Sequence, residues 1–239
     1  MINNQKSKLN LPASKLPPVK PKPGEDFRKS LHWRVFRILS EFVEGWQFLA
    51  DFKKTVSFFG SARTAEGYKW YEEARKLGKM MAEAGFAVVT GGGPGIMEAG
   101  NRGAVEGGGK SIGLNIQLEM EQRINPYVQE GMGFHYFFVR KVMLSFASRA
   151  YVFFPGGLGT LDEMFELITL IQTKKISEKI PVILMGRDYW SSIDNFLREQ
   201  NEKYDIIDKE DLNIYKIADS AEEAFELIKD APPREDWYY

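Results

Sequence analysis

An apolar run, a short turn rich in small residues and an amphipathic helix follow one another three times in this chain. The apolar runs are Lys54 to Phe59, Phe86 to Thr90 and Tyr151 to Phe154. Each run has the composition of a buried strand, and each turn leads directly into a helix. Strands joined through helices lie parallel, because a parallel connection needs a crossover. The sequence therefore predicts a Rossmann-like α/β fold, a doubly wound parallel sheet with helices on both faces.

The remaining elements continue this alternation. We expect further strands at Ser111 to Ile116, Phe134 to Phe138 and Pro181 to Met185. We expect helices at residues 70–84, from 96 onward, at 140–147, from the glycine turn to 172, at 189–201 and at 221–228. Ligands of such folds bind beyond the carboxyl ends of the strands. The turns that follow the strands are therefore the expected location of a binding site.

A chain of 239 residues is long enough for one large α/β domain with a sizeable core. Residues 1–24 are rich in Pro, Lys, Asn and Ser, which predicts a disordered tail. Residues 25–52 are predicted to hold an amphipathic helix, because apolar residues recur at three- and four-residue spacing from Leu31 to Leu49. We expect this helix to pack on the core or on a partner subunit. Residues 53–232 then form the single Rossmann-like domain, and residues 233–239 a C-terminal tail.

Composition excludes several classes of protein. The formal net charge of −1 gives no broad basic field, so nucleic-acid and membrane-surface binding are not expected. The absence of cysteine excludes disulfides, thiolate catalysis and cysteine-bound metals. No apolar run approaches the roughly 20 residues of a membrane span, and no signal-peptide core follows the N-terminal lysines. We therefore expect a cytoplasmic protein that has no membrane contact.

The turn after the third apolar run, Pro155 to Glu163, is the most informative segment. Its backbone N–H groups and the N-terminus of the following helix are expected to converge on one point, which attracts an anion such as phosphate. Thr160 is expected to cap this helix or to donate its hydroxyl to the same anion. Asp162 and Glu163 are expected in the first turn, where acidic residues also occur for dipole reasons alone. The apolar stripe of the helix is predicted to consist of Leu161, Met164, Phe165 and Ile168, with Glu163 off it.

Other motifs fail on inspection of their spacing. The stretch Gly107 to Ser111 lacks the first glycine of a phosphate loop and leads from a helix into a strand, so it is predicted to be a helix C-terminus. The dinucleotide fingerprint is incomplete at both glycine turns, so NAD is not expected. His32 and His135 are isolated, and we expect His135 to be a structural strand residue. No metal-ligand cluster has a recognised spacing, although carboxylate-bound magnesium stays open. No cofactor is predicted.

Three segments together carry a specific pattern. They are Gly91 to Glu98, the pair Arg140-Lys141, and Pro155 to Glu163, which contains the full P-G-G-x-G-T-x-x-E motif. This set resembles the Lonely Guy family of nucleoside 5′-monophosphate phosphoribohydrolases, and the N-terminal helix looks like that of its longer branch. One departure is that Phe138-Val139 precede Arg140-Lys141, where short plant-like members have His-Glu. This difference concerns the preferred base more than the chemistry.

The resemblance implies a hydrolase. Family members cleave the N-glycosidic bond of adenine-type nucleotides, including cytokinin precursors, and many are labelled lysine decarboxylases. The implied substrate is a purine nucleoside 5′-monophosphate, with adenine or N6-prenylated adenine as the base, and the products are the free base and ribose 5-phosphate. The resemblance thus implies either a role in cytokinin biosynthesis or an AMP nucleosidase activity. Relatives assemble as dimers or larger oligomers, so a homo-oligomer is expected.

The resemblance also implies roles for individual residues. Glu163 is implied as the catalytic carboxylate near C1′ of the ribose, and Arg140 as a second catalytic residue. The implied substrate-binding residues are Ser61, Gly92, Gly93, Met97, Glu98, Lys141, Gly156, Gly157, Gly159 and Thr160. Glu166, three residues beyond Glu163, is a candidate for its hydrogen-bonding partner. Without the resemblance, Met97 and Glu98 are equally typical of helix packing and capping.

Two other functions compete with the hydrolase. The first is a non-catalytic nucleotide or cofactor carrier of the same fold, because a fold does not fix a function. An intact Glu163 argues against it. The second is a pyridoxal-phosphate decarboxylase, which needs a Schiff-base lysine and a partner for the ring nitrogen. Neither group is recognisable in the sequence.

Overall fold

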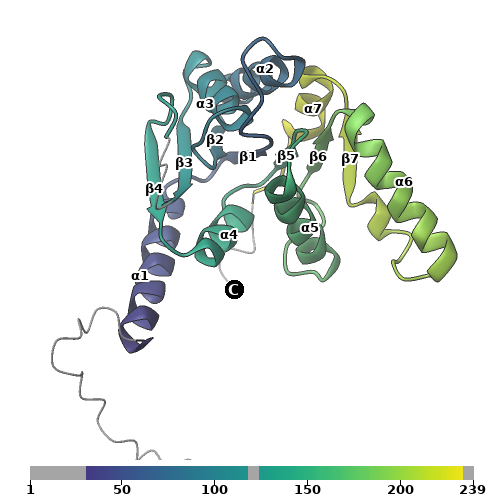
Figure 1. Ribbon diagram of the computed structural model, residues 1–239. Helices are drawn as coiled ribbons and strands as arrows, with labels where there is room; N and C mark the ends of the chain where they lie inside the picture. The colour runs from purple at the N-terminus through teal and green to yellow at the C-terminus, as the bar shows by residue number, and fades with distance from the viewer. Residues whose placement is uncertain (1–30, 118–123, 234–239) are drawn as a thin grey trace, which may run out of the picture. The chain divides into compact units, whose positions relative to one another are not determined.

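The computed structural model describes residues 31–117 and 124–233 (Figure 1). The tail predicted at 1–24, the first residues of the predicted 25–52 segment and the tail from residue 234 onward lie outside the described residues. The chain divides into two compact units, Met1–Leu39 and Ser40–Tyr239. The boundary falls within the first helix, α1 (Leu31–Ala50).

The second unit is built on a seven-stranded sheet with the order β4-β3-β2-β1-β5-β6-β7. The strands are β1 (Thr55–Phe59), β2 (Ala87–Thr90), β3 (Ser111–Ile116), β4 (Glu130–Phe134), β5 (Tyr151–Phe153), β6 (Val182–Met185) and β7 (Tyr215–Ala218). All neighbouring strands pair in parallel. From β1 the chain winds outward to β4 and then returns to β5 on the other side of β1. The prediction of a doubly wound parallel sheet is therefore confirmed.

Helices cover both faces of this sheet. They are α2 (Lys69–Glu83), α3 (Ile96–Glu106), α4 (Phe137–Phe146), α5 (Leu158–Gln172), α6 (Arg187–Tyr204) and α7 (Ala221–Ile228), with a short 3₁₀ helix, η2 (Asp211–Asn213). Helix α2 contacts α3 and α7, and α4 contacts α5. Figure 1 shows the first group on one face of the sheet and α4 and α5 on the other. No helix in the described part of the chain is long and apolar enough to cross a membrane.

The main core lies between the sheet and the helices α2, α3 and α7. Its buried residues include Val56, Val88 and Val152 from the strands and Leu77 and Met81 from α2. Strands β1, β2 and β5 are buried at every position because helices cover both of their faces. This explains why they appear in the sequence as continuous apolar runs.

The prediction of a strand at Phe134 to Phe138 is wrong. Strand β4 ends at Phe134, and the next helix already begins at Phe137. The sequence misled because β4, at the sheet edge, contains two glycines and alternates between half-buried and exposed residues, whereas the aromatic residues after it have high strand propensity. His135 is consequently an exposed residue between β4 and α4, not the strand residue we expected.

The edge strand β7 was not anticipated. Only its first and last residues are buried, so it lacks the continuous apolar run of a central strand. The prediction for Gly107 to Ser111 is confirmed: α3 ends at Glu106, the Gly109 N–H donates to the Ala104 carbonyl at 2.9 Å, and β3 starts at Ser111. Gly108 has a φ of +71°, the left-handed conformation that often ends a helix.

Candidate active site

A cleft of about 600 Å³ opens at the carboxyl ends of the central strands. Its described lining comes from the end of β1, from the loops after β1, β2 and β5, and from the N-terminal parts of α3, α4 and α5. The lining residues are Phe58, Phe59, Gly60, Ser61, Ala62, Arg63, Gly91, Met97, Phe137, Arg140, Gly157, Gly159, Thr160 and Glu163. Strands β1 and β5 are neighbours whose connections run in opposite directions. Such a switch point is where open α/β sheets bind ligands.

Seven of the predicted site residues share this cleft. They are Ser61, Met97, Arg140, Gly157, Gly159, Thr160 and Glu163. They belong to four separate segments of the sequence, so the fold brings together what the motifs suggested only by position. The other five predicted residues, Gly92, Gly93, Glu98, Lys141 and Gly156, lie close to the cleft segments in sequence but are not among its lining residues.

The turn before α5 is held by close packing. The Ser61 N–H donates to the Pro155 carbonyl at 3.1 Å, which ties the β5 turn to the β1 turn. A Cβ atom on Gly156 would collide with the Thr160 hydroxyl and would lie 3.1 Å from the Ser61 backbone nitrogen. Only glycine fits there. Gly157 forms the N-cap of α5 without any side-chain capping hydrogen bond. The N–H groups at the start of this helix therefore face the cleft without a side-chain cap, and the capping role considered for Thr160 is not observed.

Glu163 lies deeper than the sequence suggested. Helix α5 begins at Leu158 and has no acidic residue in its first turn, so the expectation that Asp162 and Glu163 lie there is wrong. The predicted apolar stripe is also partly wrong, because Phe165 is 40% exposed whereas Glu163 is only 7% exposed. The buried face of α5 consists of Thr160, Glu163, Met164, Leu167 and Ile171. A carboxylate thus occupies a core-facing position at the cleft.

Arg140 is the cation whose charge acts most strongly on this carboxylate. Its Nε donates to the carbonyl of Leu114, at the end region of β3, at 2.7 Å. Burial raises the pKa of Glu163, and the positive charge of Arg140 opposes this rise. Burial in turn lowers the pKa of Arg140, and the charge of Glu163 opposes that decrease. The buried carboxylate and the partly buried guanidinium therefore stabilise each other's charged form.

Gly91 makes room for Arg140. A Cβ atom at Gly91 would collide with the Arg140 guanidinium and would approach the Met97 sulfur to 2.8 Å. The sequence had singled out the two following glycines instead. Gly91 directly follows the buried strand β2, so the sequence puts it at the carboxyl end of that strand but does not distinguish it from the glycines that follow.

Gly92 and Gly93 face a buried polar network. The Gly92 N–H donates to the Thr90 hydroxyl, and the Asn125 backbone N–H donates to the Gly92 carbonyl, both at 2.9 Å. The Asn125 side chain donates to the Gly93 carbonyl and to the Asn101 side-chain oxygen, again at 2.9 Å. These contacts hold the second glycine turn, which follows β2, in one conformation. Asn101 and Asn125 could not be identified from the sequence, because their contacts join segments far apart in the chain.

Glu98 and Lys141 form contacts between helices. Glu98 accepts a hydrogen bond from the Tyr71 hydroxyl of α2 at 3.1 Å. The Lys141 ammonium lies 2.6 Å from an Asp162 oxygen and 3.1 Å from a Glu166 oxygen, which links α4 to α5. Glu166 therefore contacts Lys141, and within the described residues no hydrogen bond joins it to Glu163, the partner we considered. Lys141 also lowers the pKa of Glu163 through its charge, behind the larger effects of burial and Arg140.

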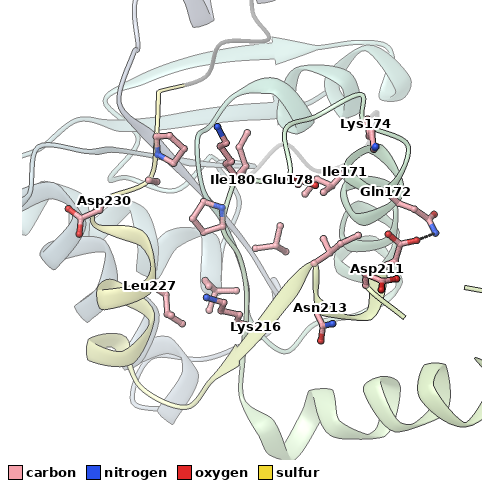
Figure 2. Close-up of a pocket in the computed structure, with 18 residues that line it drawn as sticks. Ile171, Gln172, Lys174, Glu178, Ile180, Asp211, Asn213, Lys216, Leu227 and Asp230 are labelled. Atoms are coloured by element: carbon pink, nitrogen blue, oxygen red, sulfur yellow. Dashed lines mark hydrogen bonds between the residues drawn. The ribbon is translucent and has the colours of Figure 1, made fainter. Parts of the chain in front are cut away.

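A second cavity, of about 630 Å³, lies at the amino ends of β6 and β7 (Figure 2). Its polar side chains have both signs of charge, including Lys174, Lys216, Glu178 and Asp211. Asp211 accepts a hydrogen bond from Gln172 at 2.7 Å across one side of it. None of the predicted site residues lines this cavity. Within residues 31–117 and 124–233, no group of three His, Asp or Glu residues is arranged to hold a metal ion.

Comparison with known proteins assigns the family. The family model described as possible lysine decarboxylase matches residues 97–228. A probable cytokinin riboside 5′-monophosphate phosphoribohydrolase of Oryza sativa subsp. japonica is 30% identical over 210 residues, covering 86% of this chain and 82% of the relative. The chain belongs to the Lonely Guy family. A cytokinin riboside 5′-monophosphate phosphoribohydrolase of Arabidopsis thaliana is likewise 30% identical over 188 residues, covering 77% of this chain and 86% of its own.

Solved structures with the same fold as this Lonely Guy chain include proteins with another role. The molybdenum cofactor binding protein of Rippkaea orientalis aligns with a TM-score of 0.56 at 24% identity, covering 74% of this chain and 96% of that one. The molybdenum cofactor carrier protein of Chlamydomonas reinhardtii aligns with a TM-score of 0.56 at 23% identity, covering 73% and 94%. At these identities the similarity establishes the fold alone.

Proposed function

We propose that this chain is a hydrolase that cleaves the N-glycosidic bond of purine nucleoside 5′-monophosphates. The observation that carries the proposal is a buried carboxylate, Glu163, in the same cleft as the uncapped N-terminus of α5. A helix N-terminus attracts a phosphate, and a carboxylate stabilises the positive charge that develops on a ribose ring as its bond to the base breaks. The two groups together match a substrate that has a phosphate at one end of the ribose and a leaving base at the other.

In this proposal the phosphate lies on the N–H groups of Gly157 to Thr160 and the Thr160 hydroxyl. Binding energy from the phosphate, which does not react, then fixes the sugar for attack. Met97 and Phe137 supply apolar surface on the cleft wall against which a purine can pack. Ser61 and Arg63 line the cleft from the β1 turn and are available to the ribose or the phosphate.

The chemistry parallels glycoside hydrolysis by analogy. Glu163 orients the attacking water and stabilises the oxocarbenium-like ribosyl group. The C1′–N bond breaks as the C1′–O bond forms, and the proton from water ends on the departing base. The products are the free base and ribose 5-phosphate. The positive charge of Arg140 favours the charged form of Glu163 against the effect of burial, which raises its pKa.

The base is adenine or N6-prenylated adenine in this proposal, which places the reaction in cytokinin biosynthesis or in AMP breakdown. Relatives named cytokinin riboside 5′-monophosphate phosphoribohydrolases support this substrate class. The position of the glutamate of short plant-like members is taken here by Val139, which is fully buried. A test of base preference is therefore part of the experiment.

The test is chromatographic detection of free base after incubation with adenosine 5′-monophosphate, its N6-prenylated counterpart, and the two nucleosides without phosphate. We expect base release from the monophosphates only, because binding at the N-terminus of α5 depends on the phosphate. Release from nucleosides at the same rate would contradict the role of this helix. Nucleotide binding without any base release would contradict the hydrolase and support a carrier. Visible-light absorbance of an internal aldimine in the purified protein would instead support the pyridoxal-phosphate alternative.

We further propose that the protein is a homodimer or a larger homo-oligomer. Phe137, which lines the cleft, is 50% exposed, and Leu158 at the start of α5 is 86% exposed. Apolar side chains of this size at the mouth of a site are typical of surfaces that a partner covers. Light scattering is expected to give at least twice the mass of one chain, and a monomer at micromolar concentration would contradict the proposal.

A further inference from the structure

Tyr189, near the start of α6, contacts the turn before α5. Its hydroxyl donates a hydrogen bond to the Gly156 carbonyl at 2.6 Å. The ring is held separately from this bond. It packs edge-on against Trp190 with the ring centroids 4.8 Å apart, and Trp190 is fully buried and donates its indole N–H to the Met185 carbonyl at 3.1 Å. The position of the hydroxyl is therefore set by packing in α6 and not by the bond that it makes.

This bond fixes the direction of a neighbouring N–H group. A peptide is planar and trans, so the N–H of Gly157 points opposite to the carbonyl of Gly156. Tyr189 is not among the residues that line the cleft, whereas Gly157 is. With its carbonyl directed to α6, the Gly156–Gly157 peptide presents its N–H on the cleft side. A hydrogen bond to the carbonyl also polarises the peptide, which makes its N–H a stronger donor.

Apart from the helical hydrogen bond in which the Leu161 N–H donates to the Gly157 carbonyl at 3.1 Å, the Gly157 side of this peptide is loosely packed. A Cβ atom on Gly157 would have no heavy atom within 4 Å, in contrast to Gly156, which is wedged against Thr160 and Ser61. Gly157 itself is exposed. Glycine has an unusually large conformational freedom, so an untethered peptide at this point would sample several orientations. The Tyr189 hydroxyl is the polar contact that the structure shows on the Gly156 carbonyl of this peptide.

We infer that Tyr189 is a positioning residue for phosphate binding: it holds the Gly157 N–H toward the 5′-phosphate without touching the substrate. This inference rests on the proposed function of the cleft. It predicts an effect on the affinity for the phosphate group and little effect on the bond-breaking step, because the hydroxyl acts through the backbone carbonyl of Gly156 and not through Glu163.

The experiment compares Tyr189→Phe with Tyr215→Phe. The first variant removes the hydroxyl and keeps the ring. The second removes a hydroxyl that donates to Asp194 at 2.7 Å and does not line the cleft, so it is a matched control for losing one tyrosine hydrogen bond. Calorimetric titration measures the binding of ribose 5-phosphate and of ribose, and steady-state kinetics with adenosine 5′-monophosphate give KM and kcat.

We expect Tyr189→Phe to weaken binding of ribose 5-phosphate about 10- to 100-fold, the effect of losing one aligned hydrogen bond to a charged group. KM is expected to rise by a similar factor while kcat changes less than about twofold, the pattern of lost uniform binding. Binding of ribose is expected to stay the same in both variants, and Tyr215→Phe is expected to bind ribose 5-phosphate like the unaltered protein.

Several results would overturn the inference. These are unchanged ribose 5-phosphate binding by Tyr189→Phe, an equal loss for ribose, or unfolding of this variant, which would show a structural role. If the unaltered protein binds ribose 5-phosphate but releases no base, the hydrolase proposal fails and the role of Tyr189 is still decided by the binding ratio. If the unaltered protein does not bind ribose 5-phosphate, the turn is no phosphate site and the inference fails with it.

Discussion

Replacing Glu163 by glutamine removes one negative charge from the cleft and leaves the shape of the side chain nearly unchanged. Because Glu163 is only 7% exposed, water screens its charge poorly. Two unit charges 4 Å apart interact by about 4 kcal/mol at an effective dielectric constant of 20. That is the scale of the attraction between this carboxylate and a positively charged ribosyl group. Since each 1.4 kcal/mol is about a factor of ten, kcat is expected to fall about 10²- to 10⁴-fold.

The same substitution is expected to stabilise the protein. Burial raises the pKa of Glu163, so the folded state binds a proton more readily than the unfolded chain. Folding stability is therefore lost as the pH rises from the unfolded pKa through the folded one, and at neutral pH the buried carboxylate is a net cost. Glutamine removes that cost. A gain on the order of 1 kcal/mol raises Tm by about 2–4 °C in a domain of this size.

The assay combines three measurements on Glu163→Gln. Base release from adenosine 5′-monophosphate gives kcat, titration with ribose 5-phosphate gives affinity, and thermal unfolding gives Tm. Glu178→Gln is the control, because Glu178 lines the second cavity and is exposed. An unchanged rate in Glu163→Gln would refute the assignment of the catalytic carboxylate. A lost rate together with a lower Tm would show that Glu163 supports the fold instead.

Two further substitutions test the surroundings of this carboxylate. Arg140→Gln removes the charge that lowers the pKa of Glu163, so this pKa rises and the acid limb of the kcat/KM profile moves to higher pH; an unmoved limb in the residual activity would contradict the coupling. Gly156→Ala forces a methyl group against the Thr160 hydroxyl, and overpacking of this kind is expected to lower Tm by about 4–10 °C in thermal melts. Gly157→Ala, where a Cβ meets no heavy atom within 4 Å, is its control, and equal losses in the two variants would contradict the packing argument.

The central part of the fold could be predicted because burial leaves a direct trace in a sequence. Strands β1, β2 and β5 are covered on both faces, and nearly every residue in them is apolar or small. The edge strands β4 and β7 leave no such trace, because one side of each is exposed to solvent. Their pairing depends on neighbours in the sheet that a local pattern does not contain.

The sequence could predict which turns line the cleft, but not which residue of each turn does so. That a glycine turn follows β2 is visible in the sequence, but which glycine faces the cleft is not. Asn125, more than thirty residues later, binds the carbonyls of Gly92 and Gly93 and thereby leaves Gly91 at the cleft wall. Tyr189 is a similar case, because its contact with Gly156 joins two different β–α units. Such contacts exist only after the chain has folded.

The helical geometry of α5 explains how the P-G-G-x-G-T-x-x-E motif can combine phosphate binding with bond cleavage. Thr160 and Glu163 are three residues apart, so in a helix they lie on the same face. Both are buried, and both line the cleft. A helix rises 1.5 Å per residue, so Glu163 is displaced about 4.5 Å along the axis from Thr160, whose hydroxyl is proposed to bind the phosphate. A nucleoside 5′-monophosphate likewise separates its phosphate from C1′ by the width of one ribose. The spacing T-x-x-E therefore matches the separation between the phosphate that is bound and the glycosidic bond that breaks. Inserting or removing one residue between Thr160 and Glu163 would rotate the carboxylate by about 100° about the helix axis, away from the cleft.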